Sequence, residues 1–238
     1  MFPALMLITG ILPLVLQTGD ILLTHCESTF LGRLTLRLSG GPCTHQALAY
    51  DSSTIVEAGR AIGKLQWVEL GNWIAAGAAD KPATEWAIYR RRMPFTSEQI
   101  ALIQKCLDEE LTWNRYSVAE LVLQASDDVL ARLLNRPRLG LDVVVFRRLG
   151  NVWKNGVICS KAANWPLIKV GALPEYEQYA APSDTWAYIT APTIAAQADR
   201  PAERLVSTKF IQAQCGISPA PIFMSWTRVA ESDNWRWA

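Results

Sequence analysis

The chain has 238 residues and a formal net charge of +1, which gives no electrostatic case for binding nucleic acid. Half of its residues are hydrophobic and ten are tryptophan, so it can fill the core of one sizeable domain. Its five cysteines are irregularly spaced and form no CxxC motif, which argues against zinc and thioredoxin-like sites. We expect no bound metal and no cofactor.

The first 16 residues carry no charge and lack the basic leading region and small-residue cleavage site of a signal peptide. Pro3, Gly10 and Pro13 interrupt the segment, and a spanning helix needs about 20 apolar residues. We expect an apolar N-terminal arm over residues 1–16 that packs on this chain or on a partner. The protein is expected in the cytoplasm or in a particle such as a virion, and contact with a membrane is left open.

The next part of the chain reads as a small, mostly antiparallel sheet. The apolar residues 21–24 are predicted to form a first strand, and the pattern of residues 31–38 fits either a helix or a strand. Segments 44–50 and 54–58 flank an Asp/Ser turn and predict a hairpin. Further strands are expected over residues 65–70 and 85–90.

Helices are expected to follow the sheet. Thr96 with Gln99 and Ser117 with Glu120 each fit a capping box, and apolar residues recur at helical spacing after both. Cys106 lies inside the first of these helices and is expected in the core. Residues 142–148 fit strand or helix equally, and residues 186–190 predict a last strand.

Cys159 is the most informative residue of the chain. It follows a glycine break and a short apolar stretch, and it opens a predicted helix that ends near Pro166. Unpaired N–H groups and the positive end of the helix dipole stabilise a thiolate at such a position. The thiolate is the nucleophilic form, so the placement suits covalent catalysis.

The chain has only two histidines that could act as the base for this thiol, His25 and His45. His45 lies in the first strand of the predicted hairpin and Glu57 in the second, so strand pairing can bring them together. A carboxylate in that place orients an imidazole and stabilises its protonated form. We therefore expect Cys159 as nucleophile, His45 as general base and Glu57 as the residue that orients His45, with His25 as a weaker candidate near the cleft.

The order of motifs resembles the circularly permuted NlpC-type branch of the papain-like cysteine hydrolases, the YiiX-like group. The motifs that carry the resemblance are Gly19-Asp20, Thr44-His45, Val56-Glu57-Ala58, Tyr116, Cys159-Ser160 and Pro182-Ser183-Asp184. The resemblance implies an α+β fold in which a small antiparallel sheet packs with helices over residues 17–190, and it makes Tyr116 a weak candidate for substrate binding in the cleft. Residues 191–238 then form an aromatic C-terminal extension.

The resemblance implies a thiol peptidase or amidase that forms an acyl-enzyme and cleaves an amide bond, with cell-wall peptidoglycan peptides as the substrate class. A lipid acyl hydrolase or acyltransferase with the same site is the first alternative. The second is a non-enzymatic assembly protein, for example of a virion or a secretion particle, that uses the fold as a scaffold. Its termini would then bind a protein partner or a second copy of the chain.

Overall fold

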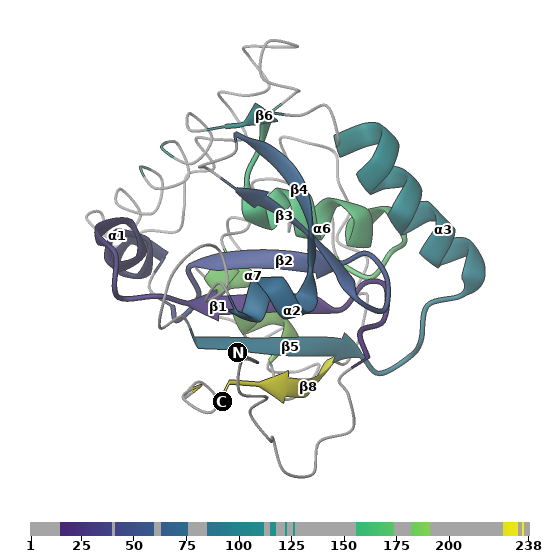
Figure 1. The fold of residues 1–238 in the computed structure, drawn as a ribbon, viewed down its shortest axis with the longest axis horizontal. Coiled ribbons are helices and arrows are strands. Elements are labelled where there is room, and N and C mark those ends of the chain that lie inside the picture. The colour runs from purple at the N-terminus through teal and green to yellow at the C-terminus, as the bar shows by residue number, and fades with distance from the viewer. Residues whose placement is uncertain are drawn as a thin grey trace, which may run out of the picture.

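The structure is a mixed fold of helices and strands, seen in a computed structural model (Figure 1). The described residues are 15–39, 41–59, 63–75, 85–111, 115–117, 122, 126, 156–173, 182–190, 226–232 and 235. The expected α+β class is confirmed, because one largely antiparallel sheet carries helices from separate parts of the chain.

The sheet has the strand order β7-β6-β4-β3-β2-β1-β5-β8. The strands are β1 (Ile21–His25), β2 (His45–Ala49), β3 (Thr54–Gly59), β4 (Lys64–Glu69), β5 (Glu85–Arg91), β6 (Arg115–Tyr116), β7 (Gly156–Val157) and β8 (Trp226–Glu231). Neighbouring strands are antiparallel, except that the short strands β6 and β7 pair in parallel at one edge. The predicted strands over 21–24, 65–70 and 85–90 are therefore confirmed to within a residue or two.

The predicted hairpin is β2 and β3. The carboxylate of Asp51 accepts hydrogen bonds from the backbone N–H groups of Ser53 and Thr54, which closes the turn between the two strands. The resulting register pairs Ala47 with Glu57. Paired residues lie on the same side of a sheet, so Glu57 shares its side with Ala47. Side chains alternate along a strand, so His45, two residues before Ala47 on β2, lies on that side as well.

The helices of the described residues come from five parts of the chain. They are α1 (Phe30–Ser39), α2 (Leu70–Ala75), α3 (Ser97–Lys105), the π-helical η1 (Cys106–Leu111), α6 (Cys159–Lys169) and α7 (Pro182–Ile189). The capping box at the start of α3 is confirmed, since Thr96 and Gln99 exchange side-chain and backbone hydrogen bonds. Residues 31–38, which the sequence left as helix or strand, belong to helix α1.

Helices cover both faces of the sheet and create two cores. On one face, α3, α6 and α7 pack against a cluster that includes Leu23, Leu48 and Ala163. On the other face, α2 places Trp73 against Leu22. Figure 1 shows α2 in front of the sheet and α6 and α7 behind it. Helix α6 contacts both β2 and β3, so the helix that begins at Cys159 rests on the two strands that carry His45 and Glu57.

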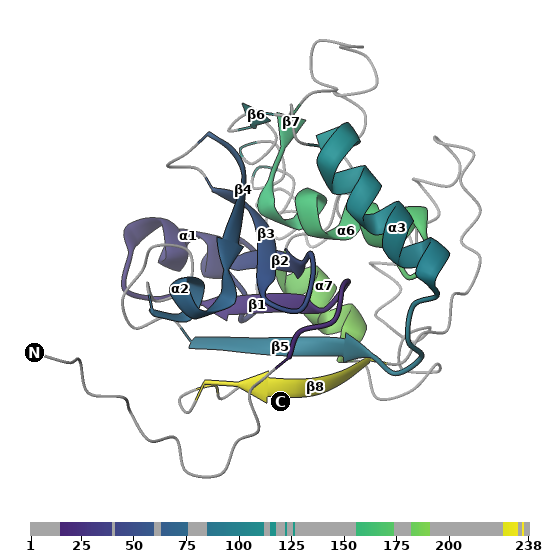
Figure 2. The same ribbon diagram turned by 45° about the vertical axis from the view of Figure 1, so that its right-hand side comes forward.

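The described parts near both chain ends belong to this same fold. Leu16 is buried in the second core, and β8 pairs with β5 at the edge of the sheet (Figure 2). Trp226 and Trp235 are buried in the first core, so these two aromatic side chains pack on the domain itself. Within the described ranges, no helix is long and apolar enough to cross a bilayer.

One element was predicted wrongly. Residues 186–190 were expected as a last strand, but they lie in and just after helix α7. Pro182 opens this helix, where its missing N–H costs no hydrogen bond, and β8 takes the remaining edge of the sheet beside β5. The segment 142–148, the N-terminal arm up to residue 14 and, apart from the helical residues 122 and 126, the helix expected after Ser117 lie outside the described residues.

Candidate active site

Cys159 is the first residue of helix α6, as the sequence predicts. Its N-cap, Ile158, has an extended backbone and an apolar side chain that supplies no capping hydrogen bond. The carbonyl of Ile158 accepts from the N–H of Ala162, which is the first bond of the helix. The N–H groups of the first turn therefore lack a capping side chain from Ile158, and their partial positive charge faces the region of the thiol.

His45 and Glu57 form a direct contact across the hairpin. The Nε2 atom of His45 lies 2.7 Å from Oε2 of Glu57. With Glu57 ionised, Nε2–H is the donor, which leaves Nδ1 of the ring for a second partner. The contact that strand pairing was expected to create is present.

Two further side chains hold the Glu57 carboxylate. Nε2 of Gln66 donates to Oε1 at 2.5 Å, and the indole N–H of Trp73 donates to Oε2 at 3.1 Å. Glu57 itself is only 3% exposed. Burial raises the pKa of Glu57, but the bond and charge of His45, followed by the bonds from Trp73 and Gln66, bring the pKa below its usual value. The carboxylate is therefore ionised and fixed in place.

The Cys159 side chain also interacts with the His45 ring, by charge and by a hydrogen bond. Burial lowers the pKa of His45, but the charge and hydrogen bond of Cys159, followed by those of Glu57, raise the pKa from 6.5 to about 10. With this pKa, the His45 ring is a cation at neutral pH. An imidazolium in this position stabilises a thiolate by the same interaction.

Both His45 and Cys159 retain some access to solvent. The His45 side chain is 15% exposed and Cys159 is 8% exposed. The pair of His45 and Cys159 is therefore not sealed within an apolar core. Cys43 and Cys106, in contrast, are fully buried at 0% exposure each.

The other described cysteines differ from Cys159 in their surroundings. In the part of the chain that the structure describes, Cys26, Cys43, Cys106 and Cys159 form no disulfide. Burial raises the pKa of the Cys43 thiol well above its usual range, which keeps that thiol protonated and unreactive. Cys106 lies in the first core, where the sequence places it.

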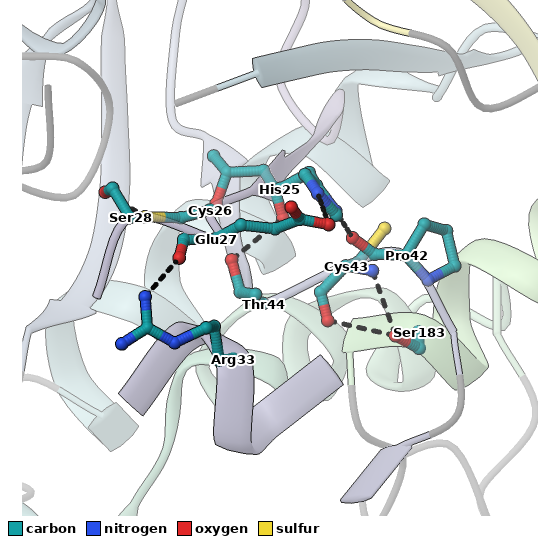
Figure 3. Close-up of polar contacts among 10 residues, drawn as sticks. His25, Cys26, Glu27, Ser28, Arg33, Pro42, Cys43, Thr44 and Ser183 are labelled. Atoms are coloured by element: carbon teal, nitrogen blue, oxygen red, sulfur yellow. Dashed lines mark hydrogen bonds and ion pairs between the residues drawn. The ribbon is translucent and has the colours of Figure 1, made fainter. Parts of the chain in front are cut away.

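His25 does not join the site. Its Nδ1 atom lies 2.5 Å from the carbonyl oxygen of Pro42, and its Nε2 atom lies 3.2 Å from the carboxylate of Glu27 (Figure 3). Both ring nitrogens are thus engaged with the loop before β2 and with the end of β1. His25 holds this loop in place, and the structure brings His45, not His25, to the thiol.

Tyr116 lies in strand β6. It pairs with Val157 of β7, two residues before Cys159, so its backbone runs beside the segment that leads into α6. Its role in substrate binding stays a prediction.

Sequence reasoning missed Gln66 and Trp73. Gln66 is the register partner of Glu57 on β4, so extending the predicted hairpin by one more strand would have indicated it. Trp73 lies in the short helix α2 and carries no local signal of its role.

Among the described residues, no three His, Cys, Asp or Glu side chains are arranged to hold a metal ion. No protein-family model matches this chain, and no curated protein sequence is significantly similar to it.

Proposed function

We propose that this protein is a thiol hydrolase that cleaves an amide bond through Cys159, His45 and Glu57, on a papain-like fold of the circularly permuted NlpC type. The observation that carries the proposal is the His45 ring, which interacts both with the Cys159 side chain and with the Glu57 carboxylate. Nucleophile, base and orienting group in this order form the arrangement used for acyl transfer on several unrelated folds.

The order of the elements supports the permuted architecture. The histidine strand β2 and the glutamate strand β3 come before the cysteine helix α6 in the chain, and α6 packs against both strands. In the unpermuted relatives that this chain resembles, the cysteine precedes the histidine.

In the proposed reaction, the Cys159 thiolate attacks the carbonyl carbon of the substrate. A sulfur–carbon bond forms, and the carbonyl π electrons move to oxygen. When this intermediate collapses, the carbon–nitrogen bond breaks and the Nδ1–H of His45 protonates the leaving amine. Water then attacks the thioester while His45 takes its proton, which releases the carboxylic acid and restores the ion pair.

The start of α6 supplies a means to stabilise the intermediate. The backbone N–H of Cys159 lies in the first turn of the helix, where Ile158 provides no competing cap. A donor at this place can bind the oxyanion as it forms, and removing one such donor typically costs about 10²–10³-fold in rate.

Peptidoglycan stem peptides are the substrate class that the resemblance implies, and digestion of purified muropeptides tests it. We expect new amine termini with the wild-type protein and none with Cys159→Ala. The matched control is Cys106→Ala, which removes a buried thiol outside the site and should leave the rate unchanged. Equal digestion by the Cys159→Ala variant would refute the proposal.

Cleavage of lipid acyl groups by the same site is the second candidate. Helix α1 connects the end of β1 to the start of β2 and exposes Phe30 (74%) and Leu34 (37%) beside the exposed Arg33. An apolar and basic surface of this kind suits an acyl chain with an anionic headgroup. Release of fatty acid from phospholipid vesicles, with muropeptides left intact, would select this candidate over the first.

A further inference from the structure

Helix α7 is hydrogen-bonded to the segment that leads into strand β2. The Ser183 hydroxyl donates to the backbone carbonyl of Cys43 at 2.9 Å and accepts from the backbone N–H of Cys43 at 3.0 Å (Figure 3). A third contact, at 3.1 Å, joins Ser183 to the hydroxyl of Ser39 at the end of α1. The Ser183 side chain thus hydrogen-bonds to both the backbone N–H and the backbone carbonyl of Cys43, two residues before His45.

The same helix also bonds the cysteine helix. The side-chain N–H of Asn164, on α6, donates to the hydroxyl of Thr185 at 2.8 Å. The side-chain oxygen of Asn164 accepts from Nε2 of Gln46 at 2.6 Å. Gln46 is the residue directly after His45, and Asn164 lies in the same helix as Cys159, five residues further along.

These hydrogen bonds, together with the backbone of α7 and of residues 43–46, form a closed circuit. It runs from β2 through Gln46 to Asn164 on α6, then to Thr185 and Ser183 on α7, and back through Cys43 to β2. Gln46, Asn164 and Thr185 are fully buried, and Ser183 is 1% exposed. Buried polar groups keep their partners because losing one leaves an unpaired group away from water, so the circuit resists changes in geometry.

We propose that α7 is a brace that sets the separation between the Cys159 sulfur and the His45 ring, with Thr185, Ser183, Asn164 and Gln46 as positioning residues. The inference rests on the proposed function and extends it to residues that touch no substrate. The inference also explains the Pro182-Ser183-Asp184 motif. The helix that this motif opens, α7, hydrogen-bonds through Ser183 to the segment before β2 and through Thr185 to α6.

The test is the pH dependence of carboxymethylation of Cys159 by iodoacetate, followed by peptide mass spectrometry. Thr185→Val removes the hydroxyl at nearly constant volume. We expect its rate at pH 6 to fall about tenfold, since misplacing a reacting pair by a fraction of an ångström has effects of this order. At pH 10, where an unaided thiol also ionises, we expect the rates of the variant and the wild type to converge.

Two variants separate positioning from general stability. Thr190→Val removes another hydroxyl bond of the same helix, from Thr190 to the carbonyl of Trp186, and should leave the rate unchanged. Thr185→Ser keeps the hydroxyl and should restore the wild-type profile. Should Thr185→Val fail to fold, Ser183→Ala provides the same comparison at the other end of the circuit.

The outcomes distinguish the brace from the active site. A folded Thr185→Val protein with the wild-type profile overturns the brace and leaves the proposed function standing. A wild-type protein whose Cys159 reacts only at alkaline pH contradicts the proposed function, and the brace with it. Equal rate losses in Thr185→Val and Thr190→Val would mean that the helix acts only through stability, which also overturns the brace.

Discussion

Replacing Glu57 with glutamine tests how the charge of one buried carboxylate acts on the thiol. Glu57→Gln keeps the shape of the side chain but removes its negative charge. An amide can also donate to Nε2 of His45, which would move the ring proton to Nδ1. The ring then presents an N–H to the thiol and cannot accept its proton, so both the charge and the tautomer become unfavourable.

The size of the effect follows from the His45 pKa. A rise from 6.5 to about 10 corresponds to about 5 kcal/mol in favour of the imidazolium. Cys159 supplies the larger part and Glu57 the smaller. Because Glu57 supplies the smaller part, we expect its loss to cost on the order of 1 kcal/mol, or about five- to tenfold in the rate of carboxymethylation at pH 6.

The assay is carboxymethylation of Cys159 at pH 6 in the wild type and in Glu57→Gln. Glu69→Gln is the matched control, because Glu69 is exposed on β4 and contacts Asn72 outside the site. We expect the control to react at the wild-type rate. An unchanged rate in Glu57→Gln, with the fold intact, would refute the coupling between the carboxylate and the thiol.

The Glu57→Gln variant should also differ from the wild type in how its stability changes at acidic pH. Because the pKa of Glu57 is lowered in the folded protein, the folded state binds fewer protons there than the unfolded chain does. Its contribution to the free energy of unfolding is present above the ordinary pKa of 4.5 and is lost as the pH falls through the folded value. Urea unfolding between pH 3 and pH 6 should therefore show a shallower loss of stability on acidification in Glu57→Gln than in the wild type.

Two further predictions concern the frame around the site. Gly41→Ala would place a Cβ 2.6 Å from Cβ of Ser183, so we expect the free energy of unfolding measured in urea to fall by about 1–3 kcal/mol. The control is Gly71→Ala, where the new Cβ meets open space and should cost no stability. Equal effects of the two substitutions would contradict the close approach of Gly41 to Ser183. Asp20→Asn breaks an ion pair with Arg90 at 2.6 Å in which Asp20 is 2% and Arg90 23% exposed. We expect a loss of about 2 kcal/mol, below that of a fully buried pair, and an unchanged unfolding midpoint would contradict it.

The sequence indicated the hairpin and the start of the cysteine helix because the signals there are local. The turn at Asp51 and the alternation along β2 and β3 fix which side chains are neighbours, and this was enough to place Glu57 against His45. The contact between Cys159 and His45 joins segments more than a hundred residues apart. Local pattern does not specify such a contact, and it was suggested only by the need of the thiol for a base and by the order of motifs.

The brace and helix α7 lay beyond sequence reasoning for a related reason. The segment before Thr190 has aromatic and β-branched residues that suit a strand, and its helical state depends on packing against α6 and on bonds to Cys43 and Asn164. Tertiary contacts here outweigh local preference. Likewise, the role of His25 in the loop before β2 depends on the carbonyl of Pro42, which no side-chain pattern reveals.

The most direct test of the central claim is the titration of the His45 ring by imidazole NMR, in a chain with only two histidines. We predict that the His45 resonances remain those of an imidazolium at pH 8 in the wild type, since its pKa lies at about 10. In Cys159→Ala the pKa should fall, because the largest favourable interaction is gone. A neutral His45 at pH 8 in the wild type, or a titration unaffected by Cys159→Ala, would contradict the ion pair on which the proposed chemistry depends.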